Sequence, residues 1–241
     1  MCNYFRTLRA DEIEVRVQQV KKSTNGKVYA QMLLYKDARV DMMLLDEKFG
    51  IFGWQREHTF KDGKNYCRVS VFDKENNVWV VKEDVGIPSN TEAEKGQASD
   101  AFKRACVNLG IGRELYTSPR IVVELANGEY YESQDARGNK VQRLSTKLHF
   151  TVKAIDYDEK RSIVALEIVD NSGRTRAKIG VIHEALFTAK AEANNARTVT
   201  EAHNVWKKYP EFQDDPGFRV ACKAKADFFA DELLNKTQQT A

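Results

Sequence analysis

The side chains that could carry out catalysis form none of the common catalytic motifs. The four histidines are far apart and include no HExxH pattern: His58, His149, His183 and His203. No GxSxG sequence is present, which would place a nucleophilic serine on a strand-to-helix turn. Gly26-Lys27 is followed by Val28 and lacks the upstream glycine of a phosphate-binding loop, so ATP hydrolysis through that motif is not expected.

Two neighbouring carboxylates leave one catalytic alternative open. Glu83 and Asp84 lie at the end of a predicted strand, and carboxylates can hold the Mg²⁺ with which nucleases activate water. Acidic residues at a strand end are more often solvated or paired with a cation. We therefore expect a protein that is not an enzyme and needs no cofactor, with a metal-dependent nuclease as the alternative.

The cysteines indicate reduced thiols and no metal site. Cys2, Cys67, Cys106 and Cys222 include no CxxC pair, so zinc is not expected. The first ten residues have no apolar segment of a secretion signal, and no stretch reaches the roughly 18 apolar residues of a membrane helix. These features predict a cytoplasmic protein without a membrane partner.

Basic side chains are the main chemical signal. Residues 1–120 carry 20 Lys and Arg against 17 Asp and Glu, whereas residues 121–241 carry 18 of each. Lys103 and Arg104 lie about 100° apart on the polar side of a predicted helix, where both could contact the phosphates of one strand without reading its sequence. The alternative is that they are ordinary solvated cations near a helix C-terminus.

The elements that would position these cations predict an α+β unit. A strand at 28–35 and a helix at 37–49 come first, preceded by residues 11–22, which fit either a strand or a helix. Turns of hairpin length, the first with Asp62-Gly63, then separate three strands of an antiparallel meander: 54–60, 66–72 and 78–85.

A second helix closes this unit. Thr91 and Glu94 have the spacing of a capping box, and Gly110 is placed to end the helix. Small and apolar residues recur between them at helical spacing: Ala98, Ala101, Phe102, Ala105, Cys106 and Leu109. The order of helix, three-stranded antiparallel meander and helix predicts that residues 30–115 form an α+β unit whose helices pack on one face of the sheet.

Residues 121–241 predict a β-rich extension followed by helices. Alternating apolar residues predict strands at 148–154, 162–170 and 175–181, and the sequence becomes helical from residue 184. Asp215-Pro216 has the pattern of a helix N-cap followed by proline. An apolar stripe continues along that helix: Phe218, Ala221, Cys222, Phe229 and Leu233. It suits packing on another protein or on the chain's own sheet.

Several short motifs of the first half occur in a specific order. The run FGIFGW at residues 49–54 is followed by the meander, by EDVG at residues 83–86 and by ASDAFKRA at residues 98–105. Together they resemble the Rad fifty-two family of single-strand annealing proteins, including its phage (Sak-like) branch. The resemblance covers residues 35–119, roughly a third of the chain.

The resemblance implies a β-β-β-α core that assembles side by side into rings or helical filaments. Family members hold single-stranded DNA in a positively charged groove and anneal strands without nucleotide hydrolysis. For this chain it implies annealing in recombination and DNA repair, in the bacterial host cytoplasm if the protein is phage-encoded. Residues 1–120 are then the DNA-binding core, and residues 121–241 serve oligomerisation or dock a single-strand binding protein or an exonuclease.

The candidate DNA-binding residues are the cations of this core. The resemblance implies Lys103, Arg104, Arg39 and Lys95, and Lys21 and Lys22 are the candidates for a cation that precedes the core. Lys61, Lys64 and Arg68 are included because a projecting basic hairpin could contact DNA. The alternatives are an ion pair with Asp37 or Asp41 for Arg39, and solubility for the hairpin.

Two features of this region have more than one interpretation. Phe49, Phe52 and Trp54 could stack on bases, but the direct run from helix into strand favours packing for at least two of them. Many family members carry an arginine one turn after the Lys-Arg pair, where this chain has Val107. The DNA-binding groove is then less basic, or Arg113, the nearest arginine, substitutes for the missing one. An interaction scaffold with a degenerate DNA-binding core is therefore a further alternative.

Overall fold

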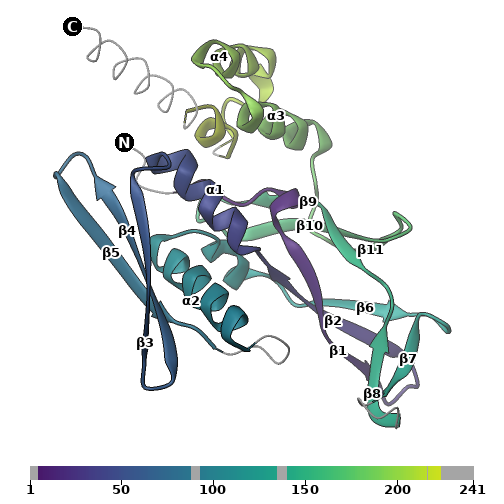
Figure 1. Cartoon of the computed structure of the whole chain (residues 1–241). Coiled ribbons are helices and arrows are strands. Elements are labelled where there is room, and N and C mark those ends of the chain that lie inside the picture. Colours follow the sequence, from purple (N-terminus) through teal and green to yellow (C-terminus); the bar gives the residue numbers. More distant parts are fainter. Residues whose placement is uncertain (1–4, 88–92, 135–139, 216, 224–241) are drawn as a thin grey trace, which may run out of the picture. The chain divides into compact units, whose positions relative to one another are not determined.

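The computed structural model describes residues 5–87, 93–134, 140–215 and 217–223 (Figure 1). Contacts within the chain divide it into two compact units. The meander unit comprises residues 7–16 and 34–117, and the large-sheet unit comprises the described residues among 1–6, 17–33 and 118–241. The large-sheet unit is thus assembled from both halves of the sequence.

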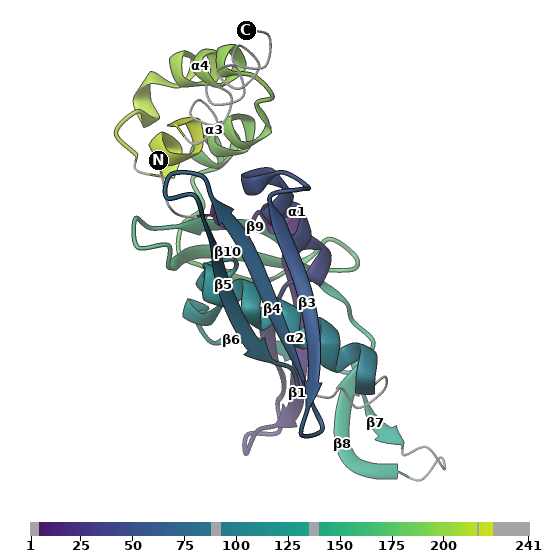
Figure 2. The same ribbon diagram turned by 60° about the vertical axis from the view of Figure 1, so that its left-hand side comes forward.

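The meander unit contains the predicted three-stranded antiparallel sheet. Its strands are β3 (Trp54–Lys61), β4 (Lys64–Asp73) and β5 (Val78–Val85), in that order across the sheet. Helix α1 (Ala38–Phe49) precedes them, and α2 (Ala93–Leu109) and the short 3₁₀ helix η2 (Arg113–Thr117) follow. Helix α2 packs on one face of the sheet, with α1 beside it (Figure 2). The predicted α+β class is confirmed.

The core of the meander unit lies between β4 and α2. The predicted helical stripe is confirmed by Ala101, Phe102, Ala105 and Cys106, which are fully buried. On the strand side Cys67, Val69 and Val71 are buried, so the odd-numbered residues of β4 face the helix. Burial raises the pKa of the Cys67 thiol to about 11, and it raises that of Cys106 further.

The strand register decides which apolar residues leave this core. Trp79 is paired with Phe72, and Val81 with Ser70. Directly paired residues share a face, so Trp79 and Val81 lie on the side of the sheet away from α2. Trp79 is accordingly 44% exposed.

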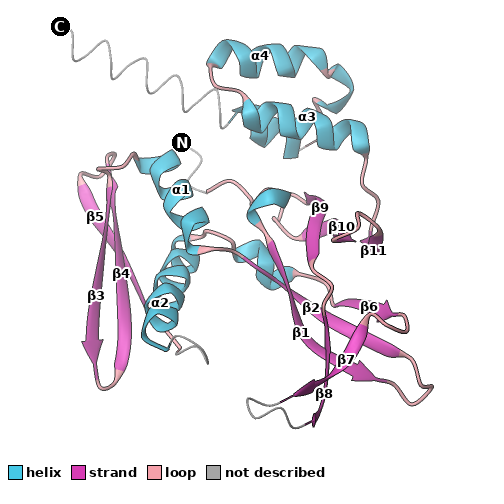
Figure 3. Ribbon diagram, turned by 45° about the vertical axis from the view of Figure 1, so that its right-hand side comes forward, coloured by secondary structure: helices cyan, strands magenta, loops and turns pink. Residues whose placement is uncertain are grey.

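The large-sheet unit is an eight-stranded sheet with the order β11-β10-β9-β1-β2-β6, to which β8 and β7 are attached through β1. Its strands are β1 (Glu14–Lys22), β2 (Val28–Tyr35), β6 (Ile121–Leu125), β7 (Tyr130–Gln134), β8 (Lys140–Thr146), β9 (Phe150–Tyr157), β10 (Ile163–Asp170) and β11 (Thr175–Ile179). Figure 3 distinguishes these strands from the helices. The predicted strand at 28–35 is confirmed, and those at 148–154, 162–170 and 175–181 exist with shifted bounds. Strands β6, β7 and β8 were not predicted.

The C-terminal helices form a cluster of their own within the large-sheet unit. Helix α3 (Glu184–Asn195), α4 (Val199–Lys208), η3 (Pro210–Phe212) and helical residues 217–223 contribute to it. Phe218 is fully buried against α3 and stacks on Trp206 at 5.7 Å between ring centroids. The predicted N-cap is confirmed, because the Asp215 carboxylate accepts from the Phe218 amide at 2.8 Å.

Three predictions fall partly on residues or side chains that the structure does not describe. They are the Thr91–Glu94 capping box, Pro216 after the N-cap, and the stripe residues Phe229 and Leu233. Among the helices that the structure describes, none combines the length and the apolar composition of a membrane-spanning segment.

Candidate nucleic-acid interface

Helix α2 holds Lys103 and Arg104 on its partly exposed side, while Phe102 and Ala105 fix the helix to the sheet. Arg104 Nε donates to Asp84 Oδ1 at 3.2 Å. Asn108 Nδ2 donates to Asp84 Oδ2, also at 3.2 Å. The end of β5 therefore orients the Arg104 guanidinium, and this hydrogen bond raises the pKa of Arg104.

Arg113 lies at the C-terminal end of the same helix. Its Nε donates to the Val107 carbonyl and its Nη2 to the Asn108 carbonyl, both at 2.8 Å. These carbonyls belong to the last turn, whose acceptors have no partner within the helix. The Arg113 guanidinium thus lies beside Val107. This position is required if Arg113 is to replace an arginine at residue 107. Lys103, Arg104 and Arg113 are called the helix cations below.

Arg39 and Lys103 both act on Asp37, although they are 64 positions apart in the sequence (103 − 39). The hydrogen bond from the Arg39 guanidinium lowers the pKa of Asp37, and the charge of Lys103 lowers it further. Arg39 Nε lies 2.9 Å from Asp37 Oδ1, which is the ion pair considered as its alternative role. The Arg39 side chain is 85% exposed, and such pairs contribute little to stability. Arg39 can therefore exchange Asp37 for another anion.

The hairpin cations are on other surfaces of the meander unit. Lys61 and Lys64 are directly paired beside the Asp62-Gly63 turn, and both are exposed. Arg68 lies on the face away from α2, where its Nε is 3.4 Å from Glu83 Oε2. Arg68 and the helix cations therefore face opposite sides of the sheet, and a single short DNA segment on α2 would not reach it.

The remaining candidates are not brought to the helix cations by any described contact. Lys21 and Lys22 are exposed at the end of β1 and belong to the large-sheet unit. Lys95 belongs to α2, but its side chain is not among those described. Arg56, which the sequence did not single out, places its guanidinium 4.8 Å from the centre of the Phe102 ring.

The three aromatic residues of the FGIFGW run have different environments. Trp54 stacks on Phe102 at 6.2 Å, and its indole Nε1 donates to Asp46 Oδ1 at 2.7 Å. Phe49 is half-buried, whereas Phe52 is 90% exposed. The expected packing is confirmed for Trp54 and in part for Phe49.

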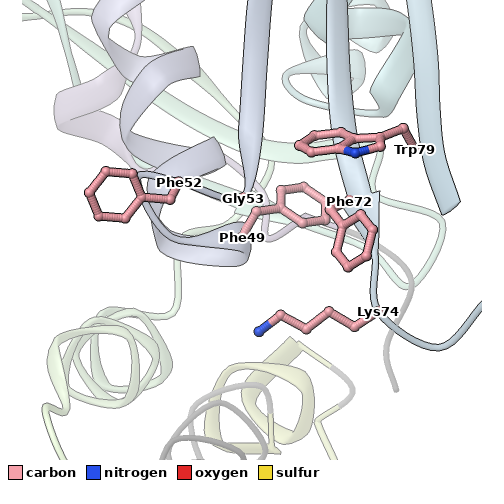
Figure 4. Close-up of a pocket in the computed structure, with 6 residues that line it drawn as sticks. All are labelled: Phe49, Phe52, Gly53, Phe72, Lys74 and Trp79. Atoms are coloured by element: carbon pink, nitrogen blue, oxygen red, sulfur yellow. The ribbon is translucent and has the colours of Figure 1, made fainter. Parts of the chain in front are cut away.

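Phe52 contributes to a pocket of about 400 Å³ between two turns of the meander unit (Figure 4). The end of α1 supplies Phe49, and the α1–β3 turn supplies Phe52 and Gly53. The β4–β5 hairpin supplies the others: Phe72, Lys74 and Trp79. This aromatic pocket was not predicted. The period of two in β4 and β5 could have placed Phe72 and Trp79 on a common face once the register was known.

Glu83 and Asp84 do not form a joint metal site. They follow one another in β5, so their side chains point to opposite faces, Glu83 towards Arg68 and Asp84 towards Arg104. Over the described ranges, no group of three or more His, Cys, Asp or Glu side chains could hold a metal ion.

A scan against protein-family models and a search of curated proteins give no match for this chain.

Proposed function

We propose that this protein binds single-stranded DNA and anneals complementary strands without ATP or a cofactor, as a homo-oligomer in recombination and DNA repair. The observation that carries the proposal is the arrangement of the helix cations. Three cations of α2 and the residues just after it lie on the rim of a β-β-β-α core. The proposed cellular site is the cytoplasm, that of the bacterial host if the protein is phage-encoded.

Hydrogen bonds connect the two arginines of this group. Asn108 donates to Asp84, which binds Arg104, and the Asn108 carbonyl accepts from Arg113. The Asp84 carboxylate therefore lies between the two guanidiniums, and the charge of Asp100 also acts on Arg104. The other acceptors of these hydrogen bonds are neutral groups. The net positive charge that remains is available to phosphates.

The chemistry of such contacts suits annealing. Cations that bind phosphates hold a strand without reading its bases, and annealing must work at any sequence. A rigid helix fixed by a buried stripe keeps the cations in place while the bases stay free to pair. The resemblance to the Rad fifty-two family supports the same function.

A pairing assay with two labelled complementary oligonucleotides tests the proposal, in EDTA and without ATP. We expect acceleration well above the spontaneous rate, and a loss of most of it in Lys103→Ala plus Arg104→Ala. Lys160→Ala plus Lys178→Ala removes the same charge from exposed positions of the large-sheet unit and should keep the activity. Retention of full activity in the helix variant would exclude these residues as the site.

The alternatives give different results in the same experiment. A metal-dependent nuclease would shorten the strands when Mg²⁺ or Mn²⁺ replaces EDTA, whereas an annealing protein leaves them intact. An interaction scaffold would not bind single strands even at low salt, where phosphate contacts are strongest. The mass of the assembly in solution tests whether it is an oligomer.

A further inference from the structure

The aromatic pocket presents apolar rings to solvent beside a turn whose backbone requires glycine at two positions. Gly50 has a φ of +74°, and a Cβ on Gly53 would lie 2.0 Å from the Phe49 carbonyl oxygen. A side chain at position 50 would be strained and one at position 53 would clash, so this turn requires both glycines. The turn holds Phe52 away from the core. Exposed apolar side chains that line a pocket are typical of binding sites.

Two lysines accompany the rings. Lys74 lines the pocket, and Lys48 Nζ lies 5.8 Å from the centre of the Phe49 ring. In Figure 4 the Lys74 side chain and the Trp79 ring lie on opposite sides of Phe49 and Phe72. The pocket thus combines flat apolar surfaces with positive charge.

Two aspartates that are close in sequence to the pocket residues, Asp73 and Asp46, are engaged in other bonds. Asp73 accepts from the amides of Glu75 and Asn76 and from Asn76 Nδ2, at 3.0, 3.3 and 2.7 Å. Asp46 accepts from the indole of Trp54. Among the described residues Lys74 forms no ion pair with either carboxylate, so its charge is available to an anionic ligand.

We propose that the aromatic pocket binds one unpaired nucleobase of single-stranded DNA, while Lys74 binds a neighbouring phosphate. Each nucleotide of a single strand offers one flat ring system and one negative charge, which is the combination that this pocket complements. Bases within a duplex are already stacked on one another and cannot enter. The volume lies near the lower end of the roughly 300–1,000 Å³ of small-ligand pockets, which suits one ring system.

The inference rests on the proposed function but uses residues other than the helix cations. The test compares two oligonucleotides of equal length, a poly-dT strand and an abasic strand with the same phosphates. We expect the wild type to bind poly-dT more tightly and Phe52→Ala to lower that affinity about tenfold, because one stacking contact is lost. The affinity of Phe52→Ala for the abasic strand should equal that of the wild type. Poly-dT should quench the tryptophan emission of the wild type but not that of a Trp79→Phe variant.

Phe60→Ala is the matched control, because Phe60 is a 69% exposed phenylalanine that does not line the pocket. If the wild type binds poly-dT and the abasic strand equally well, and Phe52→Ala does the same, the base site is overturned and the proposed function stays intact. A fall in oligomer mass in Phe52→Ala would also overturn it, because the pocket would then be an interface between copies. Failure of the wild type to bind any single strand would reject the proposed function itself.

Discussion

Lys36 Nζ and Asp41 form an ion pair inside the meander unit, where the Lys36 side chain is 5% exposed and that of Asp41 is fully buried. Lys36 also points to the Lys103 carbonyl at 3.5 Å, at the limit of hydrogen bonding. The pair therefore lies directly beneath the helix that carries the proposed DNA-binding cations. Asp41 Oδ2 is buried without a hydrogen-bond partner among the described residues.

Removing one member of this pair should destabilise the protein more than removing both. Asp41→Asn leaves a buried ammonium without its counter-ion, and we expect a loss of about 3–5 kcal/mol in the free energy of unfolding. Lys36→Met plus Asp41→Leu replaces both charges by apolar groups and should cost less than either single change. Urea denaturation of the wild type, Lys36→Met, Asp41→Leu and the double variant checks this, and additive effects would contradict it.

The same aspartate should make stability depend on pH. Burial raises the pKa of Asp41 to about 6, although the Lys36 charge opposes this. A carboxyl group whose pKa is raised on folding stabilises the folded state below its unfolded pKa, near 4. That contribution is lost as the pH rises through 6. The difference in unfolding free energy between wild type and Asp41→Asn should therefore change between pH 4 and 7, and parallel curves would reject the assignment.

The large-sheet unit contains a second buried cation. Arg176, with a side chain 7% exposed, donates to Glu129 at 2.7 Å, Asp170 at 3.1 Å and the Glu124 carbonyl at 2.8 Å. Arg174 binds the same two carboxylates but is 57% exposed. We expect Arg176→Leu to lower the unfolding midpoint clearly and Arg174→Ala to lower it only slightly. Thermal unfolding followed by circular dichroism compares them, and equal effects would contradict the importance of burial.

Local patterns were sufficient to predict the strands β3, β4 and β5 and the helix that packs on them. The Asp62-Gly63 turn has φ values of 52° and 71°, as the two-residue hairpin requires, and the stripe from Ala101 to Cys106 faces the sheet. Helix α2 ends at Leu109, directly before Gly110, where the sequence placed its end. Each of these features depends on neighbours only a few positions apart.

Features that depend on distant residues were not predictable in this way. Ala30 pairs with Val123, and no local pattern indicates that β2 joins strands of the second half. The buried Lys36–Asp41 pair contradicts the hydrophobic pattern on which a core prediction relies. At the candidate site, the sequence indicated Lys103 and Arg104, but the aromatic pocket required the register that pairs Trp79 with Phe72.

The position of Arg113 predicts how DNA binding can be weakened or strengthened. If Arg113 supplies the positive charge that Val107 lacks, Arg113→Ala should reduce the affinity for single-stranded DNA. The slope of log affinity against log salt concentration should become less steep by about 0.7, because one phosphate contact is lost. Val107→Arg plus Arg113→Ala restores a cation to the helix itself and should recover the affinity. Anisotropy titrations from low to moderate salt measure both, and an unchanged salt slope in Arg113→Ala would exclude the contact.

The annealing and nuclease hypotheses predict different effects of removing the charge of Asp84. Asp84 binds Arg104 and reduces the positive charge of the helix cations. Asp84→Asn keeps the side chain's size, so the annealing model predicts tighter binding of single strands at low salt. A nuclease that used this carboxylate would instead lose metal-dependent cleavage. Glu83→Gln is the matched control, since Glu83 faces Arg68 on the other side of β5 and should leave affinity on α2 unchanged. Weaker binding in Asp84→Asn would mean that Asp84 is needed mainly to orient Arg104.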